Sequence, residues 1–157
     1  MQHPTPTKIT TLCLAYKHPK ILLGLKKRGF GEGRWNGYGG KVEKGETLEE
    51  NVVREMQEEC GITPTKFENR GVMYFEFSEI PDQVYEVNLF LIEEYIGEPV
   101  ETEEMKPQWF GVSDLPWDKM WDDDRIWYLL FLEGKKFEGN FLFDGNEKVI
   151  RHEIEVI

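Results

Sequence analysis

The segment "GGKVEKGETLEENVVREMQEECGI", residues 39–62, restricts the fold more than any other part of the chain. Thr47 followed three residues later by Glu50 forms a capping box, and Gly61 stands where a left-handed residue ends a helix. These signals predict a helix over residues 48–60. At 100° per residue its apolar side chains share one arc of about 100°, which predicts packing on a sheet. These side chains are Val52, Val53, Met56 and Cys60.

The same helix carries five glutamates and one arginine, with no lysine. Glu55, Glu58 and Glu59 share an arc next to the apolar face, and like charges four residues apart cost about 0.2–0.5 kcal/mol per pair. A hard divalent cation removes this conflict, because Mg²⁺ is bound by carboxylate, carbonyl and water oxygens. A solvated acidic face is the other interpretation, and the helix alone does not decide between the two. Arg54, one turn before Glu58, can orient that carboxylate.

The loop before this helix, "GRWNGYGGKVEKGE", holds five glycines in fourteen residues. Such a backbone needs positive φ angles or approaches something closely. It can offer carbonyl oxygens to a metal ion and N–H groups to a phosphate. The loop therefore favours a metal site at the glutamates that follow it.

The chain as a whole predicts one α/β domain over residues 1–157, without repeats. A second helix is predicted over residues 122–133, and the acidic stretch "VETEEMKPQWF" is interpreted as a loop after the last long strand. A hairpin across "DGN" closes the chain. The predicted strands are residues 9–16, 20–27, 71–77, 84–95, 135–143 and 147–156.

Composition limits the partners of this domain. A net charge of −11 repels nucleic-acid backbones, so we expect no polymeric DNA or RNA partner. The N-terminus "MQHPTPTK" has no apolar signal region, and no apolar run approaches membrane-spanning length. Cys13 and Cys60 form neither a disulfide framework nor a zinc spacing. We therefore expect a soluble cytoplasmic protein with no membrane contact.

Nine constrained positions of the acidic segment match the Nudix box, G-x5-E-x7-R-E-U-x-E-E-x-G-U with U aliphatic: Gly40, Glu46, Arg54, Glu55, Met56, Glu58, Glu59, Gly61 and Ile62. The chain therefore resembles the Nudix hydrolases. The resemblance implies an α/β/α sandwich around a mixed sheet, and hydrolysis of a nucleoside diphosphate linked to another group. It also implies Mg²⁺, which Mn²⁺ can replace, and Arg54 as the residue that holds the glutamates in place. The implied metal ligands are Glu55, Glu58, Glu59 and a loop carbonyl at Gly39 or Gly40.

Sequence outside the box resembles one Nudix subfamily, the animal-type MutT homologues that hydrolyse oxidised purine nucleoside triphosphates. The resemblance rests on "LLGLKKRGFGEGRWNGYGGKVEKGET", "FEF", "EEMKPQWF", "MWDDDRIWYLL" and "KKFEGNFLF". It implies that Trp121 lies over the damaged purine, that Asp123 and Asp124 contact the base, and that Glu104 adds an acid to the metal site. Further substrate contacts are implied at Thr11, Lys26, Asn36, Tyr38, Gly39, Gly40, Lys41, Phe75 and Phe77.

The activity implied is hydrolysis of 8-oxo-dGTP and 2-hydroxy-dATP to the monophosphate and pyrophosphate by a monomer. Two adjacent carboxylates in an apolar pocket cannot both ionise cheaply, so Asp123 and Asp124 are predicted to share a proton. Two other functions stay open. One is a Nudix pyrophosphatase for another nucleotide, such as ADP-ribose or a dinucleotide, and the other is a non-catalytic nucleotide-binding module.

The residues of the base site also have simpler interpretations. Asp123 and Asp124 open the second helix, where aspartates are common caps and dipole partners. Trp121, Phe75 and Phe77 are by default core aromatics, although a stacking platform uses the same residue types. What favours the functional interpretation is that all these positions match the subfamily together.

Asn36 can be a turn former only, and Glu104 a plain surface acid. Two positions depart from the subfamily. Asp122 stands where proline is expected, and Tyr38 stands where phenylalanine is usual. These departures leave the reaction class unchanged and bear on which damaged base is preferred.

Overall fold

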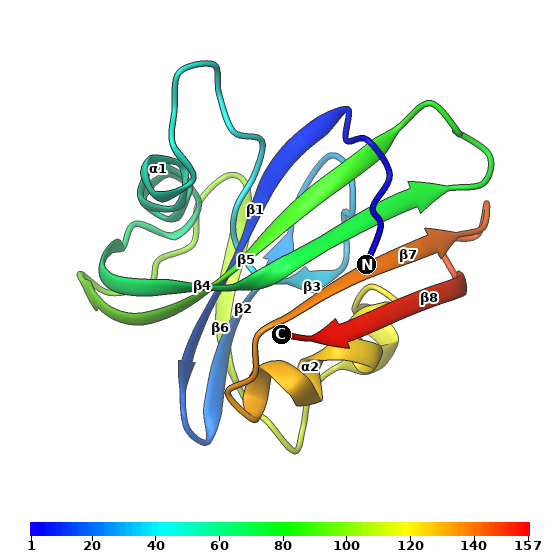
Figure 1. Cartoon of the computed structure of the whole chain (residues 1–157). Helices are drawn as coiled ribbons and strands as arrows, with labels where there is room; N and C mark the ends of the chain where they lie inside the picture. The colour runs from blue at the N-terminus through cyan, green and yellow to red at the C-terminus, as the bar shows by residue number, and fades with distance from the viewer.

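The computed structural model describes residues 1–157, and Figure 1 shows how the elements are arranged. No helix in it has the length and apolar character needed to cross a membrane. The elements in chain order are β1 (Lys8–Lys17), β2 (Lys20–Lys26), β3 (Trp35–Asn36), α1 (Leu48–Cys60), β4 (Thr63–Phe77), β5 (Val84–Ile96), β6 (Met105–Gly111), a 3₁₀ turn (Trp117–Lys119), α2 (Asp124–Leu132), β7 (Phe137–Phe143) and β8 (Val149–Val156).

The strands form one mixed sheet in the order β3-β2-β1-β5-β4-β7-β8, with β6 also paired to β2. The pairs β1–β5 and β4–β7 are parallel, and the others are antiparallel. Parallel pairs need long crossover connections, and here the chain between β1 and β5 contains α1, while the chain between β4 and β7 contains α2. Each helix therefore lies in the connection between two parallel strands.

Helix α1 has the predicted ends. The Thr47 hydroxyl accepts a 3.0 Å hydrogen bond from the Glu50 N–H, and the Glu50 carboxylate accepts one of 3.0 Å from the Thr47 N–H. Gly61 ends the helix with a φ of 75°. These two caps confirm the helix over 48–60 and fix where its glutamates lie along the axis.

The helices cover opposite faces of the sheet, as Figure 1 shows. Val52, Met56 and Cys60 of α1 are fully buried in one apolar cluster with residues of β1, β2 and β5. Trp127 and Phe131 of α2 belong to a second cluster on the other face. The α/β/α sandwich predicted for this chain is confirmed.

The structure also corrects the sequence prediction in three places. The stretch interpreted as a loop contains β6, which pairs along all of β2. Pro107 weakens the strand signal in the sequence, because proline cannot donate a hydrogen bond to a neighbouring strand. The structure tolerates it because β6 pairs with only one neighbour. Strand β4 starts at Thr63 rather than 71, since its first half is polar and mostly exposed. Helix α2 starts at Asp124 rather than 122.

Candidate active site

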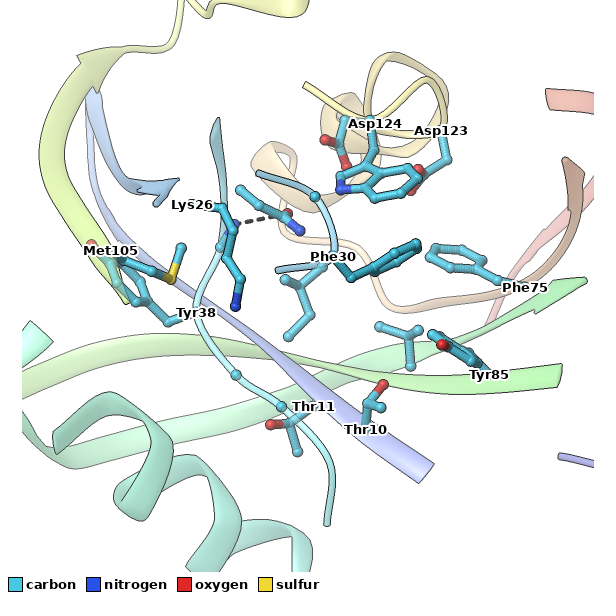
Figure 2. A pocket seen from close by; sticks show the side chains of 18 of the residues that line it. Thr10, Thr11, Lys26, Phe30, Tyr38, Phe75, Tyr85, Met105, Asp123 and Asp124 are labelled. Carbon is cyan, nitrogen blue, oxygen red and sulfur yellow. Dashed lines mark hydrogen bonds between the residues drawn. The ribbon is translucent and has the colours of Figure 1, made fainter. Parts of the chain in front are cut away.

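A cavity of 220 Å³ gathers residues that lie far apart in the sequence. Figure 2 shows Asp123 and Asp124 at one end and Thr10 and Thr11 at the other, with the ring of Phe30 between them. Pockets that enclose a whole drug-sized ligand usually measure about 300–1,000 Å³. The cavity is therefore suited to a nucleobase with the rest of a nucleotide extending outward.

Most of the site residues predicted from the sequence contribute to this cavity. Twelve of them line it: Thr11, Lys26, Asn36, Tyr38, Gly39, Gly40, Glu59, Phe75, Phe77, Trp121, Asp123 and Asp124. Five do not: Lys41, Arg54, Glu55, Glu58 and Glu104.

The glycine loop is held tightly against β1 beside the cavity. Isolated bridges pair Thr10 with Lys41 and Cys13 with Tyr38. Gly39 has a φ of +136°, and a Cβ at this position would lie 2.1 Å from the carbonyl oxygen of Thr11. Only glycine therefore allows the loop to approach β1 this closely.

Glu59 is the helix glutamate that faces the cavity. Its Oε1 accepts a 2.8 Å hydrogen bond from the Gly39 N–H, which joins α1 to the glycine loop. Burial raises its pKa to about 8, and the nearby charges of Glu55 and Glu104 act in the same direction. Its carboxylate is thus buried, close to other acids, and without a side-chain cation at hydrogen-bond distance.

Glu55 is half-buried beside the same loop. A Cβ at Gly40 would lie 2.7 Å from Oε1 of Glu55, so the second loop glycine makes room for this carboxylate. Burial raises the pKa of Glu55, and the guanidinium of Arg54, 3.2 Å away, opposes that rise.

Glu58 does not join the other two carboxylates. Its side chain is 58% exposed and lies 3.2 Å from the guanidinium of Arg54. No three acidic, His or Cys side chains form a metal-binding group in this arrangement, and the role of Glu58 as a metal ligand stays a prediction. Repulsion between like charges and the attraction of Arg54 both favour the outward position of Glu58.

Arg54 makes its shortest contact outside the helix. Its Nε donates a 2.6 Å hydrogen bond to Glu46, and its Nη2 bonds the Lys41 carbonyl at 3.3 Å. Hydrogen bonding by Arg54 lowers the pKa of Glu46 to about 2. Arg54 therefore links α1 to the loop residues Lys41 and Glu46 and fixes the helix glutamates relative to the glycine loop.

Glu104 lies at the end of β2 among basic side chains. Arg28 bonds its carboxylate at 2.7 Å, and the Lys26 ammonium lies 3.6 Å away. The hydrogen bond from Arg28 lowers the Glu104 pKa. The charge of Glu104 also raises the pKa of Glu59, so the two carboxylates interact electrostatically.

The donor set fits a hard divalent cation. Glu55 and Glu59 supply carboxylate oxygens beside the loop, and the Gly39 carbonyl accepts no backbone hydrogen bond. The Gly40 carbonyl, by contrast, accepts one from the Thr11 N–H at 3.0 Å. Oxygen donors of this kind are the ligands that Mg²⁺ prefers.

The other end of the cavity holds two buried acids. Asp123 is 2% exposed and Asp124 is 1% exposed. Trp127 donates a 2.7 Å hydrogen bond to Oδ2 of Asp123. Oδ1 of Asp123 and Oδ2 of Asp124 are buried and have no partner within the chain. Asp123 makes no side-chain cap to α2, so these acids are not explained as a helix cap.

Both acids hold their protons more tightly than ordinary aspartates. Burial raises the pKa of Asp123 to about 6, although the bond from Trp127 opposes the rise. Burial and then the charge of Asp123 raise the pKa of Asp124 well above its ordinary value. Since the two groups act on each other, they titrate as a pair, and we predict that this pair keeps one proton at neutral pH. It can then donate and accept hydrogen bonds at once.

Trp121 forms an aromatic wall beside these acids. Its ring centroid lies 5.1 Å from Phe30 and 6.2 Å from Phe143. Phe75 and Phe77 form another part of the wall and pack on Phe143 at 5.3 and 5.5 Å. These aromatics line the cavity as well as packing on the core, so both interpretations of them hold.

The remaining predicted contacts lie at the loop end. Thr11 donates its hydroxyl to Asn51 of α1, and Oδ1 of Asn36 accepts the Gly37 N–H at 2.8 Å. The Tyr38 ring is buried under α1, and its hydroxyl lies 3.5 Å from the Leu23 carbonyl. The Lys41 side chain is exposed and does not line the cavity.

Sequence reasoning missed several residues of the site. Phe30, Gly31, Tyr85 and Met105 line the cavity. Arg34 stacks on Trp121, with its guanidinium carbon 4.2 Å from the ring centroid. The run "RGFGEGRW" carried the signal for three of them, because it precedes the glycine loop and mixes aromatic, basic and glycine residues.

The carboxylates beside a glycine loop at one end of the cavity, and the buried acids at its other end, define a nucleotide hydrolase of the Nudix type. Comparison with protein families agrees, because the NUDIX domain matches residues 6–131. The chain belongs to the Nudix family, whose members generally require a divalent cation, usually Mg²⁺. The resemblance predicted from the box is confirmed.

Similar proteins cover almost the whole chain. The oxidized purine nucleoside triphosphate hydrolase of Danio rerio is 42% identical over 151 residues, which is 96% of each protein. The Mus musculus enzyme of the same name is 40% identical over the same shares. A crystal structure of the MutT protein from Bacillus halodurans superposes with a TM-score of 0.84 at 26% identity, covering 94% of this chain and 97% of that one.

Proposed function

We propose that this protein hydrolyses oxidised purine nucleoside triphosphates, such as 8-oxo-dGTP and 2-hydroxy-dATP, to the monophosphate and pyrophosphate. The observation that carries the proposal is the buried pair Asp123–Asp124, which lines the cavity together with Trp121 and has two buried oxygens without a partner in the chain. Two relatives with names of this activity, each 40% or more identical over 96% of the chain, support the same substrate class. Removing such triphosphates would sanitise the nucleotide pool.

Base recognition follows from the protonation of the acid pair. Oxidised guanine and 2-hydroxyadenine present different donor and acceptor patterns along their edges. A pair that holds one proton offers one donor and one acceptor, and the proton can move between Asp123 and Asp124. One pocket can thereby accept both bases, while Trp121 stacks on the purine and Phe75 and Phe77 close the wall. Asn36 is free to add a donor, because no hydrogen bond within the chain uses its Nδ2.

The triphosphate extends from the base toward the glycine loop and α1. Lys26 lines the cavity on this path and supplies positive charge for the phosphates. We assign Glu55, Glu58, Glu59, Glu104 and the Gly39 carbonyl as the groups that would hold Mg²⁺, with Glu58 turning inward from its position beside Arg54. Mg²⁺, when bound, neutralises phosphate charge and acidifies a bound water. Mn²⁺ offers the same coordination chemistry.

The chain's own groups then have distinct tasks. Arg54 keeps α1 and the glycine loop in register, so the carboxylates stay beside the scissile phosphate. Glu104 is the candidate general base, because its charge acts on Glu59 and its carboxylate stays ionised and able to accept a proton at neutral pH. Thr11, Gly40 and Lys41 shape the loop that faces the phosphates.

The protein is proposed to act as a monomer in the cytoplasm. The two cysteines are buried and unpaired, which is typical of a reducing compartment. A net charge of −11 disfavours a nucleic-acid polymer as the partner and leaves the free nucleotide as the substrate.

The deciding experiment measures pyrophosphate and orthophosphate release from a panel of nucleotides with Mg²⁺. The panel holds normal and oxidised purine triphosphates, ADP-ribose and a dinucleotide. We expect pyrophosphate, with kcat/KM for the oxidised purines at least tenfold above that for dGTP and dATP. Higher activity on ADP-ribose or a dinucleotide would replace this proposal with another Nudix pyrophosphatase. No turnover with clear nucleotide binding would indicate a non-catalytic module.

A further inference from the structure

Arg34 lies on the base-binding wall, in the loop between β2 and β3. Its guanidinium carbon sits 4.2 Å from the centroid of the Trp121 ring. Its Nη1 also donates to the carboxylate of Glu147. The guanidinium of Arg34 therefore makes a cation–π contact with the indole and a hydrogen bond to a carboxylate at the same time. These two contacts together fix its orientation.

Glu147 belongs to the turn between β7 and β8, and this turn is itself well ordered by local contacts. Oδ1 of Asp144 accepts hydrogen bonds from the N–H groups of Asn146 at 2.8 Å and Lys148 at 3.0 Å. Glu147 has a φ of 61°, the one positive value outside glycine. A non-glycine residue keeps such a conformation where its surroundings hold it.

The terminal hairpin reaches the base site a second time through Asp122. Oδ2 of Asp122 accepts a 2.8 Å hydrogen bond from the Val149 N–H. Asp122, next to Trp121 in the chain, is therefore bonded to the backbone of β8. Trp121 itself is linked to the same hairpin through Arg34, which stacks on it and bonds Glu147.

We propose that Arg34 is a positioning residue for base recognition, which holds the indole of Trp121 over the cavity and is itself held by Glu147. This inference rests on the proposed function, in which Trp121 stacks on a damaged purine. The terminal hairpin then sets the geometry of the base site without touching the substrate. Arg34 is absent from the cavity lining, so it acts through Trp121 and not as a substrate contact.

The charge of Arg34 also acts on the two buried acids. The groups that face them are Asp122 from the same segment, Trp127 and Tyr128 from α2, and Arg34 from its loop. Asp122 raises the pKa of Asp123, whereas Arg34 lowers the pKa of both acids. Loss of this cation should move the loss of the pair's shared proton to higher pH.

Two substitutions separate stacking from charge. Arg34→Gln removes both, and Arg34→Lys keeps the charge but loses the planar stack. We expect Arg34→Gln to weaken binding of 8-oxo-dGMP, followed by calorimetry, by about five- to thirtyfold, the range of a partly desolvated cation–π contact. The pH midpoint of the substrate ratio kcat/KM(8-oxo-dGTP) over kcat/KM(2-hydroxy-dATP) should rise in Arg34→Gln. In Arg34→Lys the affinity should fall while the midpoint stays near that of wild type.

Arg125→Gln is the matched control, because Arg125 is an exposed arginine of α2 that contacts only Trp117 and Asp118. It should change neither the affinity nor the midpoint. A double-mutant cycle with Trp121→Phe tests whether Arg34 acts through the indole, since residues that act together give non-additive effects. Glu147→Gln should reproduce part of the loss in affinity.

Three results would overturn the inference: wild-type affinity and midpoint in Arg34→Gln, the same changes in Arg125→Gln, or strict additivity with Trp121→Phe. A failure of the proposed function is distinguishable from these. In that case wild type itself binds 8-oxo-dGMP no better than dGMP, and no Arg34 variant is needed to see it.

Discussion

The backbone N–H of Gly39 donates a 2.8 Å hydrogen bond to the carboxylate of Glu59 across 20 residues of sequence. This contact joins the glycine loop to α1, because Gly39 lies in the loop and Glu59 lies in the last turn of the helix. It also orients a buried carboxylate toward the cavity. The glycine loop therefore organises the metal end of the site before any ligand arrives.

Glu59→Gln should leave the fold intact and reduce turnover by at least about a hundredfold, the scale of losing one strong electrostatic element. Glutamine keeps the size and the acceptor for Gly39 but lacks the charge that holds Mg²⁺. Mg²⁺ should accordingly raise the melting temperature of wild type more than that of the variant. Glu49→Gln, on the exposed first turn of α1, is the control. Near-wild-type turnover in Glu59→Gln would remove this metal assignment.

Gly39→Ala should destabilise the protein by roughly 3 kcal/mol or more, the upper range for single substitutions. Its Cβ would lie 2.1 Å from the Thr11 carbonyl oxygen, and this backbone atom cannot move aside. Gly45→Ala is the matched control, because its φ of +83° is strained but no atom lies within 4 Å. That change should cost about 1–2 kcal/mol. Urea unfolding measures both, and equal losses would contradict the close approach at Gly39.

Arg54→Lys should weaken Mg²⁺ binding by about ten- to a hundredfold, the usual effect of removing a group that orients metal ligands. Lysine keeps one charge but cannot contact Glu46, Glu55 and Glu58 together, as the guanidinium does. Titration of Mn²⁺ or Mg²⁺ into both proteins by calorimetry measures the change. Unaltered affinity would mean that Arg54 contributes only to the stability of the helix.

The sequence predicted local structure well wherever a short-range signal determined it. The bounds of α1 follow from Thr47, Glu50 and Gly61, and these contacts are all made within the helix and its ends. The Nudix box likewise has a fixed spacing, so its loop and helix were placed correctly. Twelve of the predicted site residues line one cavity, although they lie in distant segments of the chain. They could be predicted because the resemblance to the subfamily extends over those segments.

What the sequence did not predict depends on contacts between distant segments. Strand β6 exists because it pairs with β2, and neither the acidic run that precedes it nor Pro107 indicates a strand. Glu58 lies outward because Arg54 and the other glutamates act on it in three dimensions. The stacking of Arg34 on Trp121 joins a loop after β2 to the segment before α2, 87 residues later. No local pattern encodes such a contact.

Asp124→Asn should change the ratio of kcat/KM for 8-oxo-dGTP over 2-hydroxy-dATP across pH 6–9. An asparagine fixes one donor and one acceptor, whereas the carboxyl pair can move its proton to suit either base. Asp118→Asn should change that ratio little, because Asp118 is fully exposed and does not line the cavity. Steady-state kinetics of the three proteins provide the measurement. A wild-type ratio in Asp124→Asn at every pH would leave these acids without a role in choosing the base.

Asp123→Asn should make the protein relatively more stable as the pH rises from about 4 to 7. Burial raises the folded-state pKa of Asp123 from 3.8 to about 6. A raised pKa means that the folded protein binds the proton more tightly than the unfolded chain does, so wild type loses stability as the pH rises through this window.

Asparagine cannot ionise, and its oxygen still accepts the Trp127 hydrogen bond, so the variant should lack this loss. Urea unfolding at pH 4, 5, 6 and 7 gives the difference in unfolding free energy between the two proteins. That difference should move in favour of Asp123→Asn at each step upward in pH. The fully exposed Asp118 provides the control, since Asp118→Asn should run parallel to wild type. Parallel curves for Asp123→Asn would show that Asp123 ionises as easily in the folded protein as in the unfolded chain, and a shared proton in the base site would lose its physical basis.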